Sequence, residues 1–277
     1  MPRLKPMMVQ RSFKYAALAA LAIFILFPVY YMLVTSFKTQ NEILQNPGFW
    51  ILHPTLVNYG AIVSNGVLHG VLNSAIVAVS STIVALAVSV LGGYSLASLR
   101  YRLRGAVRYL LIFAYLIPST ILFIPMTVLM ADVGLIDTLP GLIICYLSFT
   151  TPLGTWLLMG FFQSLPPELE EQARVDGATR VGALWHILLP LTRPGMMAVG
   201  VIIFTAAWNE YLYALVLNIS PAVYTLPLAI SGLISGDVYR WGEIMAGSVI
   251  ASLPVVSMYY LSQRFVIEGL TSVAVKG

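Results

Sequence analysis

The sequence predicts an all-α integral membrane protein with six transmembrane helices, on the evidence of its composition, its apolar runs and the placement of its charges. Of its 277 residues, 59% are hydrophobic and only 9% are charged. Soluble domains carry roughly 25% charged residues, so most side chains here must face lipid or other apolar helices. The mean hydropathy of +0.87 agrees with that conclusion.

The first expected span is Tyr15–Val34, which follows a basic cytoplasmic arm formed by residues 1–14. The run contains no charged residue and has about the length that crossing a bilayer requires. A cleaved signal peptide is the alternative, but its apolar core is usually shorter and ends at a cleavage site between small residues. This run ends instead in Pro28-Val-Tyr-Tyr-Met-Leu, which favours a retained transmembrane helix.

Five further apolar runs complete the six expected spans: Val71–Leu99, Leu110–Met130, Leu139–Phe162, Met196–Leu217 and Ile244–Phe265. Proline removes a backbone donor and clashes with the preceding turn of a helix. Pro118 and Pro125 are therefore expected to interrupt the third span. Gly92 and Gly93 are expected at a close contact between helices, because small residues let helix backbones approach each other. Residues 266–277 form a cytoplasmic tail.

The basic residues are distributed unevenly between the two sides of these spans. With both termini on one side, all 15 Lys and Arg except Lys38 and Arg240 fall on that same side. Cytoplasmic loops of membrane proteins carry the excess of positive charge. The sequence therefore predicts that both termini are cytoplasmic, and so is the loop of about residues 164–193 between the fourth and fifth spans.

The composition of that loop predicts two short helices joined at a bend. Pro166 and Pro167 can open a helix, because the first turn has amide groups with no partner to lose. The acidic residues that follow lie near the positive end of the helix dipole. Gly177 can take the left-handed conformation that ends a helix, and Thr179 can cap the next one.

The spacing of this segment resembles the cytoplasmic EAA loop of the membrane subunits of bacterial ABC importers. That family's pattern is Glu-Ala-Ala, three residues, Gly, nine residues, Ile, one residue, Leu-Pro. Its counterparts here are Glu171, Ala173, Gly177, Ile187 and Pro190, with Asp176 and Ala178 beside the glycine and Gln172 in place of the usual second residue, Ala. The resemblance implies that this loop docks on an ATPase subunit. Ala173, Gly177 and Ala178 would let the partner approach, and the acidic residues would pair with its Lys or Arg.

The stretch Trp208-Asn209-Glu210 places a carboxylate inside the fifth expected span. A charge at the centre of a span costs roughly 2.5–3.5 kcal/mol on insertion scales, so a partner is expected. At 1.5 Å per residue, Glu210 lies about 21 Å from Met196, towards the outer face. The stretch resembles the Trp-Asn-Glu/Asp segment of carbohydrate-type importer subunits, which implies that these residues line the outer part of the pathway or its gate. A structural hydrogen-bonded pair at a helix interface is the alternative.

The last residues resemble the Gly-Leu-Thr-x-Gly-Ala-Val-Lys-Gly ending of the second membrane subunit of maltose-type importers. The matching residues are Gly269, Leu270, Thr271, Lys276 and Gly277, with Val273 in place of the usual glycine. In that family the tail reaches into the interface between two ATPase subunits. The outer loop Asn218–Trp241 corresponds to the family's segment that probes the cleft of the solute-binding protein.

The sequence argues against chemistry carried out by this chain itself. It lacks the Gly-x4-Gly-Lys-Ser/Thr loop that cradles phosphates, and its three histidines are scattered, which argues against a metal cluster. No paired catalytic residues lie within the spans, which disfavours an intramembrane enzyme. A secondary transporter would need an ionisable coupling site near the bilayer midplane. Glu210 is the sole candidate, and this alternative stays open.

The resemblance covers nearly the whole chain and implies a permease subunit of a carbohydrate-uptake ABC importer in the bacterial inner membrane, with residues 15–265 as its transmembrane domain. The implied partners are a second homologous permease, two ATP-binding subunits that hold ATP and Mg²⁺, an extracytoplasmic solute-binding protein and membrane lipid, but no nucleic acid. No cofactor is expected in this chain. ATP binding would drive alternating access through the docked loop. The sequence does not identify the solute.

Overall fold

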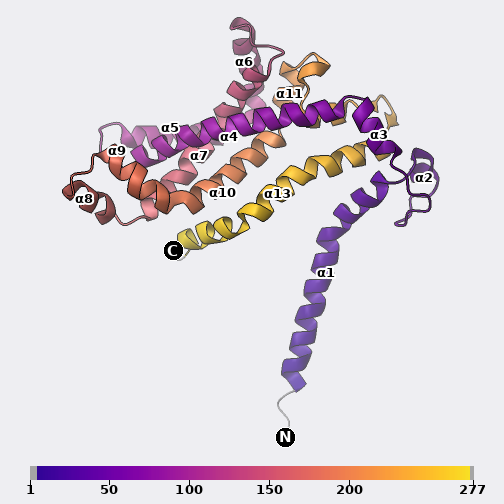
Figure 1. Cartoon of the computed structure of the whole chain (residues 1–277), viewed down its shortest axis with the longest axis horizontal. Helices are drawn as coiled ribbons and strands as arrows, with labels where there is room; N and C mark the ends of the chain where they lie inside the picture. Colours follow the sequence, from indigo (N-terminus) through magenta and orange to yellow (C-terminus); the bar gives the residue numbers. More distant parts are fainter. Residues whose placement is uncertain (1–4, 275–277) are drawn as a thin grey trace. The chain divides into compact units, whose positions relative to one another are not determined.

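The computed structural model describes residues 5–274, which are almost entirely helical (Figure 1). The chain divides into two compact units. The first comprises Met1–Val67 and Ile230–Ser252, and the second comprises Leu68–Ala229 and Leu253–Gly277. Helix α13 (Trp241–Ala274) passes from the first unit into the second.

The first unit contains α1 (Lys5–Ser36), α2 (Gln40–Gln45), α3 (Val57–Ser64), the antiparallel pair β1 (Ile234–Ser235) and β2 (Val238–Tyr239), and the first turns of α13. Its centre is Asn58, which is only 6% exposed. The Asn58 amide donates to the carbonyls of Ser36 and Lys38, at 2.8 Å each. Gly242 packs so closely that an added Cβ would lie 2.5 Å from the Asn58 amide. Asn58 therefore ties the end of α1 and the start of α13 to α3.

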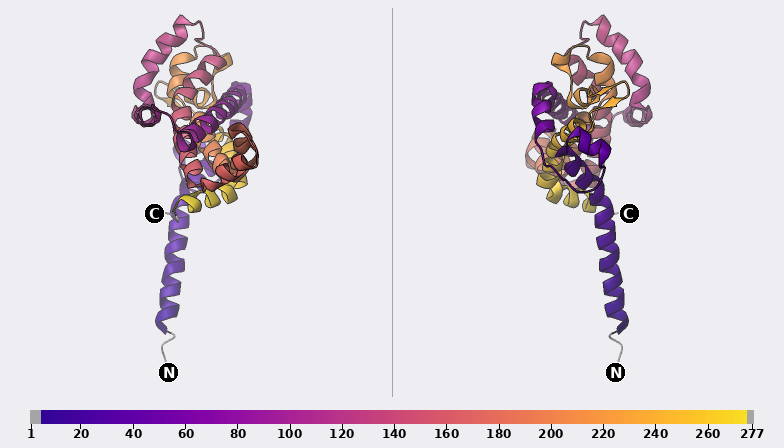
Figure 2. Two further views of the ribbon diagram at one scale, coloured as in Figure 1. Left: turned by 90° about the vertical axis from the view of Figure 1, so that its left-hand side faces the viewer. Right: turned by 90° about the vertical axis from the view of Figure 1, so that its right-hand side faces the viewer.

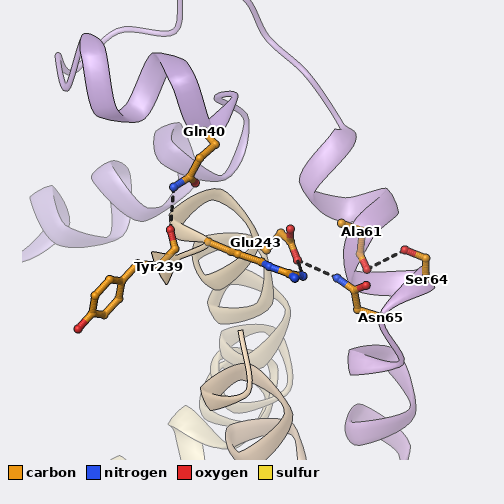
Figure 3. Close-up of polar contacts among 7 residues, drawn as sticks. Gln40, Ala61, Ser64, Asn65, Tyr239 and Glu243 are labelled. Atoms are coloured by element: carbon orange, nitrogen blue, oxygen red, sulfur yellow. Dashed lines mark hydrogen bonds and ion pairs between the residues drawn. The ribbon is translucent and has the colours of Figure 1, made fainter. Parts of the chain in front are cut away.

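A second set of polar contacts joins the hairpin and α13 to the rest of this unit (Figure 3). Gln40 donates through Nε2 to the carbonyl of Tyr239 at 2.7 Å, and Asn65 donates through Nδ2 to Glu243 Oε2 at 2.9 Å. Glu243 also pairs with Arg240 at 3.5 Å. These bonds fix the hairpin between β1 and β2 against α2 and the start of α13 against the end of α3.

The second unit is a bundle made of α4 (Val67–Ser98), α5 (Arg104–Leu116), α6 (Ser119–Asp132), α7 (Leu139–Ser164), α8 (Glu168–Val175), α9 (Arg180–Ala183), the π-helix η1 (Leu184–Leu188), α10 (Leu189–Trp208), α11 (Leu212–Leu217) and the 3₁₀ turn η2 (Pro221–Val223). Helix α12 (Leu226–Ser231) begins in it and ends in the first unit. Helices α4, α7 and α10 run side by side (Figure 1), and their core consists of the buried residues Ala85, Val90, Tyr94, Leu158, Phe162, Leu184, Leu188, Leu189, Val199 and Ile203.

Glycines let these three helices approach closely. A Cβ on Gly154 of α7 would lie 2.5 Å from Ser89 Oγ of α4 and 2.8 Å from Ile203 Cδ1 of α10. Gly92 and Gly93 of α4 face α7, where an added Cβ would come within 2.9 Å of Thr155 and 3.0 Å of the Met159 amide. The predicted close contact at Gly92 and Gly93 is confirmed.

Within residues 5–274, five helical segments are long and apolar enough to cross a membrane: Phe13–Ser36, Val67–Ser98, Leu139–Ser164, Arg180–Trp208 and Trp241–Gln263. The pair α5 and α6 makes a sixth if it is counted as one span. The expected six spans therefore agree with the fold in number when that pair is included.

The third expected span, Leu110–Met130, is interrupted at Pro118, as predicted. Helices α5 and α6 are bent by 97° at a break that contains Ile117 and Pro118, and Figure 2 shows the turn. Ile117 has extended backbone with ψ 119°, the conformation that a following proline favours. Pro125 lies inside α6 without breaking it, so only one of the two prolines acts as expected.

The fifth expected span, Met196–Leu217, is wrong at both ends. The helical segment starts at Arg180 and runs through η1 into α10, because a π-turn bond from the Leu189 amide to the Leu184 carbonyl carries the chain past Pro190. It stops at Trp208, and α11 is a separate short helix. The region around Glu210 is therefore a break between helices.

Candidate functional site

The segment between α7 and η1 forms two short helices at a bend, here called the α8–α9 elbow (residues 166–183; Figure 1). Gly177 has φ +90°. Its amide donates to the Arg174 carbonyl at 3.2 Å, while the Ala178 amide donates to the Ala173 carbonyl at 2.9 Å. This pair of bonds is the Schellman ending of a helix, which needs a left-handed residue. Thr179 then caps α9 by accepting from the Gly182 amide at 3.1 Å. The predicted helix end and cap are confirmed.

The elbow is continuous with the bundle core. Helix α9 runs through η1 into α10 without a break in helical structure. Leu184, Leu188 and Leu189 on this stretch are buried among residues of α4 and α7. Helix α9 is therefore joined to α10 both by continuous helical structure and by a shared packed core.

The predicted contact residues of the elbow differ in accessibility. Glu171, Asp176 and Gly177 are exposed, and Ala178, Ile187 and Pro190 are half-buried. Ala173 is only 4% exposed. Helix α8 contacts η1 within the chain, and the close approach of a partner at Ala173 stays a prediction.

Exposed apolar side chains around the elbow were missed by the sequence analysis. Val175, Val181 and Trp185 are 87%, 63% and 59% exposed. Hydropathy along the sequence does not distinguish these residues from their buried neighbours, such as Leu184.

A hydrogen bond attaches the elbow to α4. The Tyr94 hydroxyl donates to Glu170 Oε1 at 3.0 Å, and the Tyr94 ring packs edge-on against Phe162 at 5.9 Å. Tyr94 itself is only 6% exposed. The two partners are 76 residues apart, so no local pattern in the sequence indicated the contact.

Replacing Tyr94 with phenylalanine is expected to loosen α8 without disturbing the bundle, because the ring stays and only the hydroxyl is lost. Hydrogen bonds to charged groups contribute about 1.5–3 kcal/mol when buried, and partial exposure of Glu170 lowers this to about 1 kcal/mol. Hydrogen exchange at the amides of α8 should rise roughly five-fold. Tyr115→Phe is the matched control, since Tyr115 is 51% exposed. Equal exchange in both variants would contradict the attachment.

The arginines after α4 also have a structural role. Arg104 donates through Nε and Nη2 to the carbonyls of Leu96 and Ala97, at 2.9 and 2.6 Å. Arg108 donates to the same Leu96 carbonyl. The last carbonyls of a helix have no partner within the helix and attract positive charge, so these two residues cap the end of α4.

At the other end of α10, the stretch from Trp208 to Glu210 is a helix junction. Trp208 is 2% exposed and stacks on Phe204 at 5.6 Å, whereas Asn209 is exposed. Glu210 accepts from the amides of Tyr213 at 2.9 Å and Ala214 at 3.3 Å. The partner that the buried charge requires is therefore the amino end of α11. Helix α10, which has 20 residues and is about 30 Å long, lies together with η1 between this junction and the elbow.

Asp137 fastens the loop that follows α11. Its backbone has φ 60°, and its amide donates to the Leu217 carbonyl at 2.9 Å. Its carboxylate accepts from the amides of Ile219 at 2.7 Å and Ser220 at 2.8 Å, and from the Ser220 hydroxyl. The hydroxyl of Ser220 and these amides hold the pKa of Asp137 below its usual value, since they stabilise the charged form.

The hydrogen bonds that the Asp137 carboxylate accepts from Ile219 and Ser220, here called the Asp137 latch, are expected to break in acid. Around neutral pH they are expected to be independent of pH. Folding lowers the pKa of such a carboxyl, so its charged form stabilises the fold above the unfolded-state pKa of about 3.9. That stabilisation is lost as the pH falls through the lower folded-state pKa. Amide exchange at Ile219 and Ser220, corrected for intrinsic rates, should therefore stay constant from about pH 8 to 5 and rise below about pH 4. In Asp137→Ala, exchange should already be fast at pH 7. Unchanged protection in that variant would count against the latch.

The predicted tail residues are only partly described. Gly269, Leu270 and Thr271 lie on the backbone of α13, and Lys276 and Gly277 lie outside the described residues. Across the described part of the chain, no group of three or more His, Cys, Asp or Glu is placed to hold a metal ion.

Comparison with known proteins shows similarity over nearly the full length. Residues 89–271 match the family described as binding-protein-dependent transport system inner membrane component. The inner membrane ABC transporter permease protein YcjP of Escherichia coli is 36% identical, over 95% of both chains. The sulfoquinovosyl glycerol transport system permease protein SmoH of Agrobacterium fabrum is also 36% identical, over 96% of this chain and 94% of its own.

A third relative is the trehalose/maltose transport system permease protein MalG of Thermococcus litoralis, which is 32% identical over 93% of this chain and 94% of its own. Among solved structures, a chain of a bacterial ABC transporter that imports the acidic polysaccharide alginate superposes with a TM-score of 0.77. It is 21% identical, over 95% of this chain and 98% of that one.

Proposed function

Because this chain belongs to the binding-protein-dependent transport system inner membrane components, we propose that it is one of two permease subunits of an ATP-driven importer for a sugar or sugar derivative. The observation that carries the proposal is its similarity, along nearly its whole length, to permeases named for the transport of glycosides and disaccharides. An inner-membrane permease of this family is the transport component, and ATP is hydrolysed by separate subunits.

In this proposal the α8–α9 elbow is cytoplasmic and docks on an ATP-binding subunit. Glu171, Asp176 and Gly177 are exposed on it, and Ala178 is half-buried beside them. Val175, which is 87% exposed, supplies apolar contact. Ile187 lies in η1, which joins the elbow to α10, and Pro190 lies in the first turn of α10. Alternating access would then arise because a nucleotide-driven movement of the docked elbow is passed along α10 to the outer junction at Asn209 and Glu210.

The proposed assembly contains a second homologous permease, two ATP-binding subunits with ATP and Mg²⁺, and an extracytoplasmic solute-binding protein. The tail from Gly269 to Gly277 would contact the ATP-binding subunits. The outer loop Asn218–Trp241 would face the binding protein, and Asp137 holds the start of that loop. A solved bacterial alginate ABC transporter is in complex with an alginate pentasaccharide-bound periplasmic protein, which supports a solute-binding partner.

Site-specific labelling tests the orientation. Cys145 is buried and is the chain's single cysteine, so the native chain provides a low background. Val175→Cys should react with a membrane-impermeant maleimide only in inside-out vesicles, and Ser235→Cys only in right-side-out cells. Labelling of Val175→Cys from outside would overturn the proposal. Pull-down of the tagged chain should also retain an ATP-hydrolysing subunit.

The alternative, an ion-coupled transporter that uses Glu210, is not favoured, because the matching family and relatives are components of binding-protein-dependent and ABC transport systems. Both carboxylate oxygens of Glu210 accept bonds from the amino end of α11, which gives the charge a structural role. We expect uptake in proteoliposomes of the assembled complex to require ATP and to persist when ion gradients are collapsed. Glu210→Gln keeps one acceptor oxygen and should not change this requirement. Uptake driven by an ion gradient alone would favour the alternative.

A further inference from the structure

A cleft of about 530 Å³ lies between the end of α4, the start of α5 and the α8–α9 elbow. These elements meet at one end of the bundle (Figure 1). The charged residues that line the cleft are Arg100, Arg104, Arg174, Arg180, Glu170 and Glu171. Its volume falls in the range of small-molecule sites, and its walls carry more positive than negative charge.

Some of the charged side chains in the cleft have hydrogen-bond partners in the described part of the chain, and others do not. Arg104 is held by the carbonyls at the end of α4, and Glu170 accepts the hydroxyl of Tyr94. Arg100, Arg174 and Arg180 are exposed. In the described part of the chain, none of these three guanidinium groups forms an ion pair or a hydrogen bond, since the single ion pair found there joins Arg240 and Glu243.

We propose that this cleft binds a phosphate-bearing anion between Arg100, at the end of α4, and Arg174 and Arg180 on the elbow. Guanidinium groups match phosphate with paired hydrogen bonds, and they do so better than ammonium groups. The exposed carboxylate of Glu171 suits a ligand that also carries hydroxyl groups, because it can accept from them. The fitting class is therefore a hydroxylated phosphate ester, either the headgroup of a phosphatidylglycerol-like lipid or a soluble glycerol or sugar phosphate.

The position of the cleft agrees with this chemistry. Arg100 stands two residues beyond the end of the candidate span Val67–Ser98, where lipid headgroups meet water. Basic pockets at the ends of transmembrane helices bind anionic headgroups on the cytoplasmic side, which is where the proposed function places this cleft. A bound phosphate would bridge α4 to both helices of the elbow and so restrain its movement. That consequence rests on the proposed function, whereas binding itself does not.

The experiment uses the full-length chain, with the subunits that co-purify, in phosphatidylcholine nanodiscs. Phosphatidylglycerol is added to the bilayer in one arm and sn-glycerol 3-phosphate to the buffer in the other, and binding is read by native mass spectrometry and by the shift in melting temperature. Each of Arg100→Gln, Arg174→Gln and Arg180→Gln should weaken binding about five-fold. Binding should also weaken as salt is raised, because exposed charges are screened.

Arg102→Gln is the matched control, because Arg102 is an exposed arginine of the same turn that does not line the cleft. Arg100→Lys should restore part of the affinity, since the charge returns without the paired donors. Phosphatidylglycerol that stays bound to the native chain but not to the cleft variants supports the lipid source. A shift in melting temperature with sn-glycerol 3-phosphate supports the soluble source. Binding in neither arm, or equal loss in Arg102→Gln, overturns the proposal.

These outcomes are independent of the proposed function. Binding is measured without ATP and without a transported solute, so a failure of ATP-driven uptake would appear in the transport assay and leave this result unchanged. The triple variant Arg100→Gln, Arg174→Gln and Arg180→Gln tests the consequence for coupling. If it has lost the phosphate ligand but keeps normal ATP-driven uptake, the ligand does not control coupling.

Discussion

Replacing Gly177 with leucine is expected to abolish ATP-dependent uptake while the chain still inserts into the membrane and folds. Gly177 has φ +90°, and left-handed backbone costs residues other than glycine roughly 1–2 kcal/mol. Apart from its chain neighbours, no atom lies within 4 Å of a Cβ added at this position, so the first carbon of a side chain has room. The loss of uptake is therefore expected to have one of two causes: a changed backbone conformation of the elbow, or a side chain that protrudes from its docking surface.

A series at Gly177 separates these two causes. Asparagine tolerates left-handed backbone better than other residues, so Gly177→Asn adds bulk with little strain. Gly177→Ala adds strain with little bulk. If the protruding side chain blocks docking, uptake should fall in the order Ala, Asn, Leu, with less than a tenth of the activity left in the leucine variant. If backbone strain dominates, the alanine variant should be worse than the asparagine variant.

Gly134→Leu supplies the matched control. Gly134 has φ +70° and no atom within 4 Å of an added Cβ, but it lies in the turn between α6 and α7, far along the bundle from the elbow. The two leucine variants should show similar losses of thermal stability, yet only Gly177→Leu should lose co-purification with an ATP-hydrolysing subunit. Normal uptake by Gly177→Leu would remove the basis for docking at the elbow.

The features that could be predicted from the sequence are those set by local chemistry. The lack of charge required membrane helices, and the elbow's ends followed from Gly177 and Thr179, whose backbone and side-chain preferences act within a few residues. The break at Pro118 was expected for the same reason, although its 97° angle was not. Such effects need no knowledge of distant partners.

The features that escaped prediction depend on contacts between distant parts of the chain. Tyr94 meets Glu170 and Asp137 meets Ser220 across 76 and 83 residues, and hydropathy assigns each of them only to a span or a loop. The burial of Ala173 depends on how α8 packs on η1. Glu210 was expected within a span because the apolar run continues on both sides of it. Its carboxylate instead caps a new helix, which a count of apolar residues does not reveal.

Replacing Gly154 with leucine is expected to prevent the bundle from forming. Gly154 lies where α4, α7 and α10 cross, and even a Cβ would approach Ser89 Oγ to 2.5 Å and Ile203 Cδ1 to 2.8 Å. Real Cβ atoms do not come so close, so the side chains of Ser89 and Ile203, or the helices that carry them, must shift. Overpacking a tight interior costs typically about 1–3 kcal/mol for a small addition, which is the expected loss for Gly154→Ala. Leucine adds three more carbon atoms in the same space.

Gly160, on the same helix, provides the control, since no atom lies within 4 Å of an added Cβ there. Purified in detergent, Gly160→Leu should elute as a single species with a melting temperature close to that of the native chain. Gly154→Ala should melt several degrees lower, and Gly154→Leu should aggregate or be degraded. Because helices in lipid associate through close packing more than through hydrophobic burial, a native melting temperature for Gly154→Leu would mean that these three helices are not in contact as described.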